Sequence, residues 1–129
     1  MTIAPVLTIA GSDSSGGAGI QADLKTMTML GCFGMSAITA LTAQNTTGVR
    51  EICPVPAAFL EQQIAAVCED IPPLAVKIGM VYDIPQIHAI AAAVRKYRLP
   101  HVVVDPVMVA TSGDALLRSQ AQTALTQEL

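Results

Sequence analysis

The chain has 129 residues, a formal net charge of −3, 52% hydrophobic residues and only 13% charged residues. This length favours a single domain over residues 1–129. The only basic cluster lies at residues 95–98, and two tyrosines and two phenylalanines are the only aromatic rings. This composition argues against nucleic-acid binding.

The sequence also argues against a membrane or secreted protein. No apolar run reaches the ~18 residues of a membrane span. The N-terminus lacks the basic start and the cleavage site of a signal peptide. The three cysteines have no C-x-x-C spacing, which argues against a disulfide framework or a zinc site. We therefore expect reduced thiols in a cytoplasmic protein.

A glycine-rich segment joins the first predicted strand, over residues 5–10, to the first predicted helix. It reads AGSDSSGGAGIQAD over residues 10–23, and apolar positions at helical spacing follow from Ile20 to Leu30. Glycines let backbone amides approach a ligand at the positive end of the helix dipole. We expect this segment to form the floor of a small-molecule site, with a polar or anionic group as its guest.

Strands and helices alternate along the rest of the chain. The pattern predicts strands over 33–42, 74–78 and 101–105, a polar loop over 43–48, helices over 57–71 and 83–98, and a last helix from Ala115 capped by Asp114. Asp83 and Gln86 form a start like a capping box for the helix over 83–98. Such alternation indicates an α/β fold with a mostly parallel sheet and helices on both faces.

Four polar or soft side chains follow predicted strands: Asp13, Gln44, Met80 and Asp105. Ligands of parallel α/β sheets bind beyond the carboxyl ends of the strands. The Gln44 amide offers donors and an acceptor that complement an aminopyrimidine edge, although a glutamine in a polar loop is usually just solvated. Asp105 suits either magnesium bound to nucleotide phosphates or hydrogen bonds from loop amides. Lys77, within an apolar strand, is expected to snorkel or to pair with a carboxylate.

Two nucleotide-binding patterns are candidates for the glycine-rich segment. Residues 17–22 fit G-x-G-x-x-A, the loose dinucleotide pattern. No acidic residue lies between Asp23 and Glu51, so the carboxylate that would bind a ribose hydroxyl is missing. No Gly-Lys-Ser/Thr follows the glycines, which excludes a Walker P-loop. A turn that merely packs the helix on the sheet is the remaining structural interpretation.

Four separated motifs together resemble one enzyme family. They are AGSDSSGGAGIQAD at 10–23, TAQNT at 42–46, KIGM at 77–80 and DPVM at 105–108. In order and spacing they are similar to the hydroxymethylpyrimidine/phosphomethylpyrimidine kinases of thiamine biosynthesis, in the ribokinase superfamily. The resemblance implies a transferase that uses ATP and Mg²⁺ to phosphorylate a hydroxymethyl aminopyrimidine and then its monophosphate.

The resemblance also implies roles for seven residues of this chain. It implies that Gln44 hydrogen-bonds the pyrimidine, that Met80 and Val107 line its pocket, that Gly11, Ala18 and Asp23 surround the hydroxymethyl end, and that Asp105 helps to organise magnesium and the triphosphate. No catalytic residue is expected here, because the chain resembles the N-terminal half of a typical member, without the nucleotide-binding half. An incomplete parallel sheet leaves an open edge, so we expect a homo-oligomer or weak pyrimidine binding by this segment alone.

Two further interpretations stay open at the level of sequence. A pyridoxal or pyridoxine kinase of the same superfamily would bind a similar flat ring with a hydroxymethyl group. Alternatively, the chain is a non-catalytic pyrimidine-binding fragment, because the resemblance covers only half of a kinase.

Overall fold

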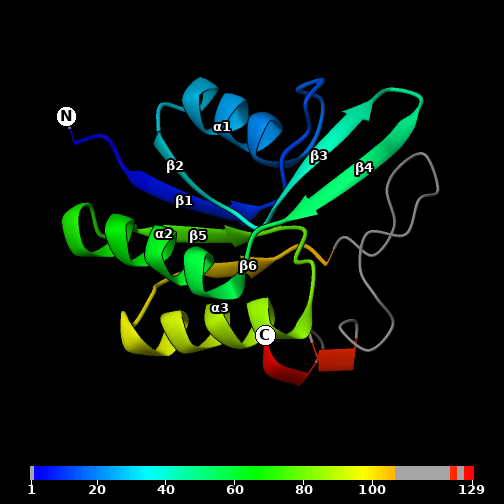
Figure 1. Ribbon diagram of the computed structural model, residues 1–129. Coiled ribbons are helices and arrows are strands. Elements are labelled where there is room, and N and C mark those ends of the chain that lie inside the picture. Colours follow the sequence, from blue (N-terminus) through cyan, green and yellow to red (C-terminus); the bar gives the residue numbers. More distant parts are fainter. Residues whose placement is uncertain (1, 107–122, 125–126) are drawn as a thin grey trace.

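The chain forms a parallel sheet with helices on both faces, as the alternation of elements predicts (Figure 1). The computed structural model describes residues 2–106, 123–124 and 127–129. In chain order its elements are β1 (Pro5–Ala10), α1 (Gly19–Met29), β2 (Phe33–Ile38), β3 (Ala40–Asn45), β4 (Gly48–Pro54), α2 (Ala57–Asp70), β5 (Ala75–Ile78), α3 (Ile84–Lys96) and β6 (Val102–Val104). The helix predicted from Ala115, with its cap at Asp114, begins outside the described residues.

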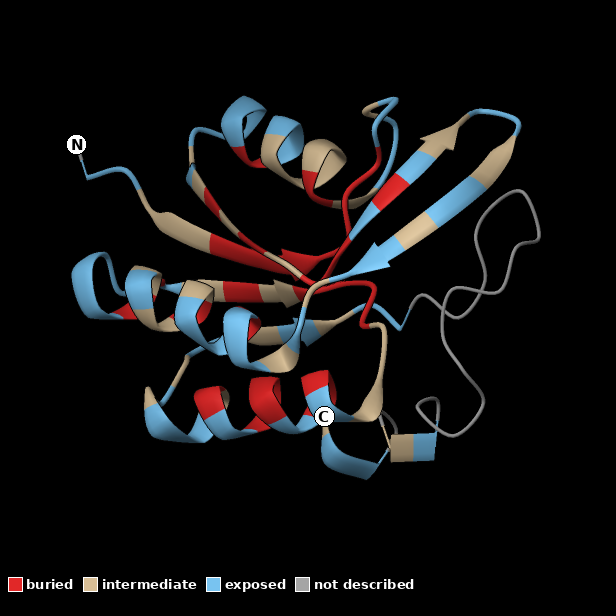
Figure 2. Cartoon of the chain, viewed as in Figure 1, coloured by how far each residue is buried: buried red, intermediate tan, exposed pale blue. Residues whose placement is uncertain are grey.

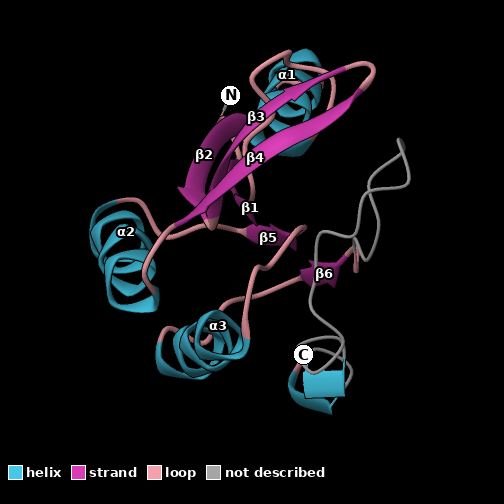
Figure 3. Cartoon of the chain, turned by 45° about the vertical axis from the view of Figure 1, so that its right-hand side comes forward, coloured by secondary structure: helices cyan, strands magenta, loops and turns pink. Residues whose placement is uncertain are grey.

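The main sheet has four parallel strands in the order β2-β1-β5-β6. β1 is a central strand, since Leu7 lies opposite Met35 of β2 on one side and Val76 of β5 on the other. Helix α1 covers one face, and α2 and α3 cover the opposite face (Figure 3). The carboxyl ends of the strands therefore meet at one edge, where the segment after β1 begins.

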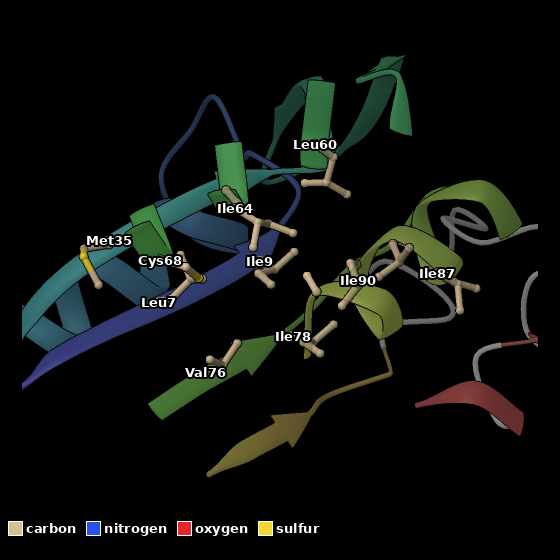
Figure 4. Packing of buried hydrophobic residues seen from close by; sticks show 13 residues of the cluster. Leu7, Ile9, Met35, Leu60, Ile64, Cys68, Val76, Ile78, Ile87 and Ile90 are labelled. Atoms are coloured by element: carbon tan, nitrogen blue, oxygen red, sulfur yellow. The ribbon is translucent and has the colours of Figure 1, made fainter. Parts of the chain in front are cut away.

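The main core lies between the sheet and helices α2 and α3 (Figure 4). Strand residues at alternating positions face it, because successive side chains of a strand point to opposite faces. Its fully buried large side chains include Leu7, Ile9, Leu60, Ile64, Val76, Ile78, Ile87 and Ile90. Burial is concentrated in β1, in the segment that follows it and on the inner side of α3 (Figure 2). The apolar residues that recur periodically in these strands and helices thus pack together in one core between the sheet and helices α2 and α3.

The prediction of one strand over residues 33–42 is wrong. β2 ends at Ile38, and β3 begins at Ala40 in a different sheet. Between them, the Thr39 N–H donates to the Ala10 carbonyl at 2.9 Å, and the Thr39 carbonyl accepts from the Val55 N–H at 2.9 Å. These long-range hydrogen bonds turn the chain out of the main sheet, and a local apolar pattern cannot reveal them.

The hairpin of β3 and β4 was not predicted. β3 extends to Asn45, into the predicted polar loop, and pairs antiparallel with β4. In Figure 1 the hairpin extends away from the parallel sheet. One signal was available in the sequence, because Asn45 to Gly48 is a short polar stretch containing glycine between two segments of strand length.

Helix α3 begins as the sequence predicts. The Asp83 carboxylate accepts from the Gln86 N–H at 3.0 Å, as in a capping box. The Gln86 side chain, however, does not return to the Asp83 N–H; its Oε1 accepts from the Tyr82 N–H at 3.0 Å. None of the helices in the described part of the chain has the length and apolar character that a membrane crossing needs.

Gln86 is a fully buried polar side chain that joins distant segments. Its Nε2 donates to the Thr39 carbonyl at 2.7 Å and to the Val55 carbonyl at 2.6 Å. These two carbonyls flank the hairpin, so Gln86 fixes both of its ends to α3. A buried carbonyl without a partner costs free energy, which makes this amide part of the support for β3.

We expect Gln86→Leu to lower the free energy of unfolding by about 2–4 kcal/mol, because it removes one of two donors to the buried Thr39 carbonyl and a donor to the partly buried Val55 carbonyl. Urea unfolding followed by circular dichroism measures this change. Gln62→Leu, at an exposed position of α2, is the matched control and should change stability by less than about 0.5 kcal/mol. Equal losses in both variants would contradict this role of Gln86.

Candidate functional site

The segment after β1 is hydrogen-bonded along β3, although the two are far apart in sequence. The Ser12 N–H donates to the Ala40 carbonyl at 2.9 Å. Thr42 donates two hydrogen bonds to Ser12. The Thr42 N–H donates to Oγ of Ser12 at 3.1 Å, and the Thr42 hydroxyl donates to the Ser12 carbonyl at 2.7 Å. Ser12 and Thr42 are both buried. These bonds fix the glycine-rich segment against the hairpin.

Ser14 fixes the backbone of Gln44 in the same way. Its hydroxyl donates to the Gln44 carbonyl at 2.6 Å, and its Oγ accepts from the Gln44 N–H at 2.9 Å. The register of β3 and β4 shifts between Ala43 and Gln44, and such irregularities re-aim side chains. The Gln44 Oε1 accepts from the Thr42 hydroxyl at 3.3 Å. Gln44 is therefore held at a defined position beside the glycine-rich segment.

The Asp13 carboxylate is the centre of that segment. Its Oδ1 accepts from the Ser15 N–H at 2.9 Å and from the Ser15 hydroxyl at 2.8 Å. Its Oδ2 accepts from the Gly17 N–H at 3.0 Å and from the Ala18 N–H at 2.9 Å. Asp13 is only 3% exposed. Burial by itself raises the pKa of Asp13, but the hydrogen bonds from Ser15, Gly17 and Ala18 together bring it below its usual value.

Three of the backbone amides that were expected to face a polar or anionic ligand are already hydrogen-bonded within the chain. The N–H groups of Ser15, Gly17 and Ala18 already donate to the carboxylate of Asp13. The chain thus supplies its own anion there. Glycine spacing reveals that backbone amides converge, but it does not reveal which acceptor they bind.

Glycines allow two close approaches beside this loop. Gly19 has φ of 58°, and a Cβ there would lie 2.3 Å from the Gly11 carbonyl oxygen. That same carbonyl accepts from the Ile20 N–H at 2.9 Å. A Cβ at Gly11 would lie 2.8 Å from Sδ of Met80. Gly11 is therefore packed between the start of α1 and Met80.

An open hollow with a volume of about 240 Å³ lies between the loop and the tip of the hairpin. Its lining consists of Asp13, Ser15, Gly17, Ala18, Gln44, Asn45 and Thr46. Five of the seven lining residues have polar side chains, and these combine acceptors with hydroxyl and amide donors. Such a set of groups can hydrogen-bond a small polar molecule on several sides.

The structure brings together two of the residues predicted to bind substrate, Ala18 and Gln44, in this hollow. Met80 is buried and packs with Ala40. Asp23 forms an ion pair with Lys77, which is one of the two alternatives expected for that lysine. Asp13, a candidate from its position after the first strand, also lines the hollow, whereas Gly11, Asp23, Met80 and Asp105 do not.

Asp105 is not among the residues that line the hollow. Asp105 is exposed just after β6, where its N–H donates to the Ile78 carbonyl at 2.8 Å. Val107 lies outside the described residues. Within the ranges that the structure describes, no group of three or more His, Cys, Asp and Glu side chains is arranged to hold a metal. A single carboxylate such as Asp105 suits Mg²⁺, which proteins often bind through one or two carboxylates together with substrate phosphates and water.

Three lining residues were not singled out from the sequence: Ser15, Asn45 and Thr46. Asn45 has a local signal, because its Oδ1 accepts from the Thr47 N–H at 2.9 Å and from the Thr47 hydroxyl at 2.6 Å. Asparagine commonly forms such a turn with the residue two positions later. Without knowledge of the hairpin, however, this turn cannot be placed beside the glycine-rich loop.

Comparisons with known protein families, sequences and structures all find phosphomethylpyrimidine kinases. The family model described as phosphomethylpyrimidine kinase matches residues 13–129. The chain is 52% identical over 129 residues to the hydroxymethylpyrimidine/phosphomethylpyrimidine kinase of Bacillus subtilis, covering 100% of this chain and 48% of that protein. It is 58% identical over 123 residues to the kinase of the same name from Rhizobium meliloti, covering 95% of this chain and 46% of that protein.

A solved structure of phosphomethylpyrimidine kinase from Clostridium difficile has a similar fold, with a TM-score of 0.90 and 54% identity. The similarity covers 97% of this chain and 54% of that one. The chain thus spans about half the length of the proteins compared here.

We expect Asp13→Asn to lower the free energy of unfolding by about 1–3 kcal/mol at neutral pH, because the amide nitrogen cannot accept the N–H groups that one carboxylate oxygen accepts. Since the pKa of Asp13 is lowered in the fold, its stabilising contribution is present above about pH 4 and is lost as the pH falls through the lower folded-state value. The difference between wild type and variant should therefore shrink in acid. Urea unfolding over a pH series measures it.

Asp70→Asn is the matched control for this series. Asp70 is exposed in the last turn of α2, where a negative charge opposes the helix dipole, so its loss should be neutral or slightly stabilising. A stability difference for Asp13→Asn that stayed constant down to pH 2 would refute the role of the carboxylate.

Proposed function

Because the chain belongs to the phosphomethylpyrimidine kinase family, we propose that it forms the substrate-binding part of an ATP-dependent kinase in thiamine biosynthesis. The substrates are a hydroxymethyl aminopyrimidine and its monophosphate. The observation that carries the proposal is the hollow in which Gln44 of the hairpin faces the loop of Asp13 and Ala18. Residues 1–129 act as one α/β unit in this proposal.

Gln44 supplies the pyrimidine recognition in this proposal. A primary amide can donate to a ring nitrogen and accept from an exocyclic amino group in one plane. The two hydrogen bonds between Ser14 and the Gln44 backbone support this role, because a fixed backbone leaves less conformational freedom to be lost on binding. A flat heterocycle with an amino group is the guest that such an amide distinguishes.

The remaining residues of the proposed site surround the ring and its hydroxymethyl group. Gly11, Ala18 and Asp23 lie toward the hydroxymethyl end, and Met80 and Val107 form apolar walls. Support comes from the close packing of Gly11 on Met80, which joins two of these residues, and from the position of Ala18 in the hollow with Gln44. Apolar walls with a few directed polar groups are typical of small-molecule sites.

ATP and Mg²⁺ are the proposed cosubstrate and metal. Asp105 would hold Mg²⁺ on the triphosphate side, which is consistent with its exposed position at a strand end. Bound magnesium neutralises charge on the phosphates during transfer of the γ-phosphoryl group to the hydroxymethyl oxygen. Residues 1–129 bind and orient the pyrimidine in this scheme, and we assign no catalytic residue among them.

We also propose a cytoplasmic homo-oligomer. The support is Val103 of the edge strand β6, an apolar side chain that is 62% exposed. An exposed apolar edge strand favours association with another chain.

A vitamin B6 kinase is the second candidate function. The structure of the pyridoxal kinase from Staphylococcus aureus in complex with pyridoxal aligns with a TM-score of 0.86 and 35% identity. This identity is lower than that to the pyrimidine kinases. Pyridoxal is therefore the comparison ligand for the binding experiments.

We expect the chain to bind hydroxymethylpyrimidine, and Gln44→Glu to weaken this binding at least tenfold, because the carboxylate replaces the amide donor with an acceptor. NMR titration of the labelled chain measures dissociation constants even when binding is weak. Gln62→Glu adds the same charge at an exposed site on α2 and should bind as wild type does. Tighter binding of pyridoxal than of the pyrimidine would favour the second candidate.

A phosphoryl-transfer assay with magnesium and ATP decides between an active enzyme and a binding part. Because most catalysis in phosphoryl transfer comes from positioning and from charge neutralisation around the phosphoryl group, we expect these 129 residues to bind pyrimidine with little or no turnover. Turnover comparable with that of a complete kinase would contradict this expectation. Absence of pyrimidine binding would contradict the proposed function itself.

A further inference from the structure

A partly buried ion pair lies on the α1 face of the sheet, outside the hollow. The Lys77 Nζ lies 3.0 Å from Oδ2 and 3.1 Å from Oδ1 of Asp23. The Thr8 hydroxyl also donates to Oδ2 at 2.6 Å. The carboxylate is therefore held on both oxygens by groups from two neighbouring strands.

The pair is accessible at the margin of α1. Thr8 and Lys77 lie opposite each other in the register of β1 and β5, and Lys77 lies opposite Val103 of β6. These three residues share one face of the sheet, and Val103 is largely exposed there. The Lys77 and Asp23 side chains are 26% and 19% exposed. A small molecule can therefore approach both charges.

The sequence leaves space for the Lys77 ammonium beside the proposed substrate residues. A Cβ at position 79 would lie 2.8 Å from Nζ of Lys77 and 3.0 Å from Cβ of Ala10. Gly79 is not among the glycines with positive φ, so space rather than backbone conformation distinguishes this position. The ammonium therefore lies beside Gly79, which directly precedes Met80 in the chain.

We propose that Lys77 determines whether the site accepts the phosphorylated substrate, because its ammonium offsets the charge of Asp23 where the substituent of the pyrimidine lies. This inference rests on the proposed function, which puts the hydroxymethyl end beside Asp23. With Lys77 present, the pair is neutral as a whole and tolerates both an alcohol and a phosphate. Without it, Asp23 repels a phosphate group that carries close to two negative charges at neutral pH.

If the ion pair of Asp23 and Lys77 only held α1 against the sheet, its loss would have a different effect on ligand binding. Its loss would weaken the binding of every ligand by a similar factor. A specificity role would instead change the ratio of the dissociation constants for the monophosphate and the alcohol. This ratio is the decisive quantity, because general damage to the fold leaves it unchanged.

The experiment titrates the 129-residue chain with hydroxymethylpyrimidine and with its monophosphate, by NMR at constant ionic strength. In Lys77→Met, the ratio of the two dissociation constants, monophosphate over alcohol, should rise about tenfold or more. Lys77→Arg keeps the charge and should leave the ratio within about threefold of wild type. Lys96→Met, on α3 across the sheet, removes the same charge far from the pair and should not change it.

Asp23→Asn provides a test that does not depend on the folding of Lys77→Met. With the carboxylate removed, the Lys77 ammonium is free to attract phosphate, so the ratio should fall below that of wild type. A ratio unchanged in both Lys77→Met and Asp23→Asn, with both ligands still bound, would overturn the inference and leave the proposed function intact. Failure of the wild-type chain to bind either ligand would overturn both.

Discussion

The hydrogen bonds that join the segment after β1 to strand β3 are the constraint on which the candidate site depends. Ser12 and Ser14 each exchange two hydrogen bonds with β3, with Thr42 and Gln44 respectively. Buried backbone groups need partners, and the serine side chains supply them where the main sheet has ended. The hairpin and the glycine-rich loop are therefore built as one unit. Gln44 has a defined position relative to Ala18 only because of this unit.

The carboxylate of Asp13 gives the same loop an internal anion. Four hydrogen bonds to one buried carboxylate hold the amides of Ser15, Gly17 and Ala18 in place before any ligand is present. Polar networks that are fully satisfied make a region rigid and specify one conformation. A site organised in this way loses less conformational freedom on binding. The loop therefore acts as a fixed wall beside the pyrimidine in the proposed function.

Local patterns in the sequence were sufficient for α1, α2 and α3 and for the parallel strands apart from the end of β2. Strand β1, helix α2 and the start of α3 at Asp83 follow from periodicity and capping, because these signals lie within a few residues of one another. The bend at Thr39 depends on Ala10, Val55 and Gln86, which no local window contains. The hairpin and the hollow were missed for this reason. The four motifs identify the family because they depend only on residue type and spacing, and not on tertiary contacts.

The partners of single polar residues were likewise only partly predictable. For Lys77 the sequence left snorkelling or a carboxylate partner open, and it could not name Asp23, which lies on α1 across the sheet face. For Asp13 a strand-end position indicated a site, but not that its carboxylate bonds to its own loop. In both cases the missing information is tertiary, since the partner is selected by how a helix or loop packs on the sheet.

The central place of β1 has a consequence for how the chain is made. β1 is synthesised before β2, which can pair with it soon afterwards, but the other edge of β1 stays open until Val6 meets Ala75 of β5. Contacts this far apart in sequence form slowly, and an open strand edge invites pairing with other chains. During synthesis, β1 therefore has one unpaired edge until β5 is made, and a chaperone that covers this edge would protect the chain during that interval.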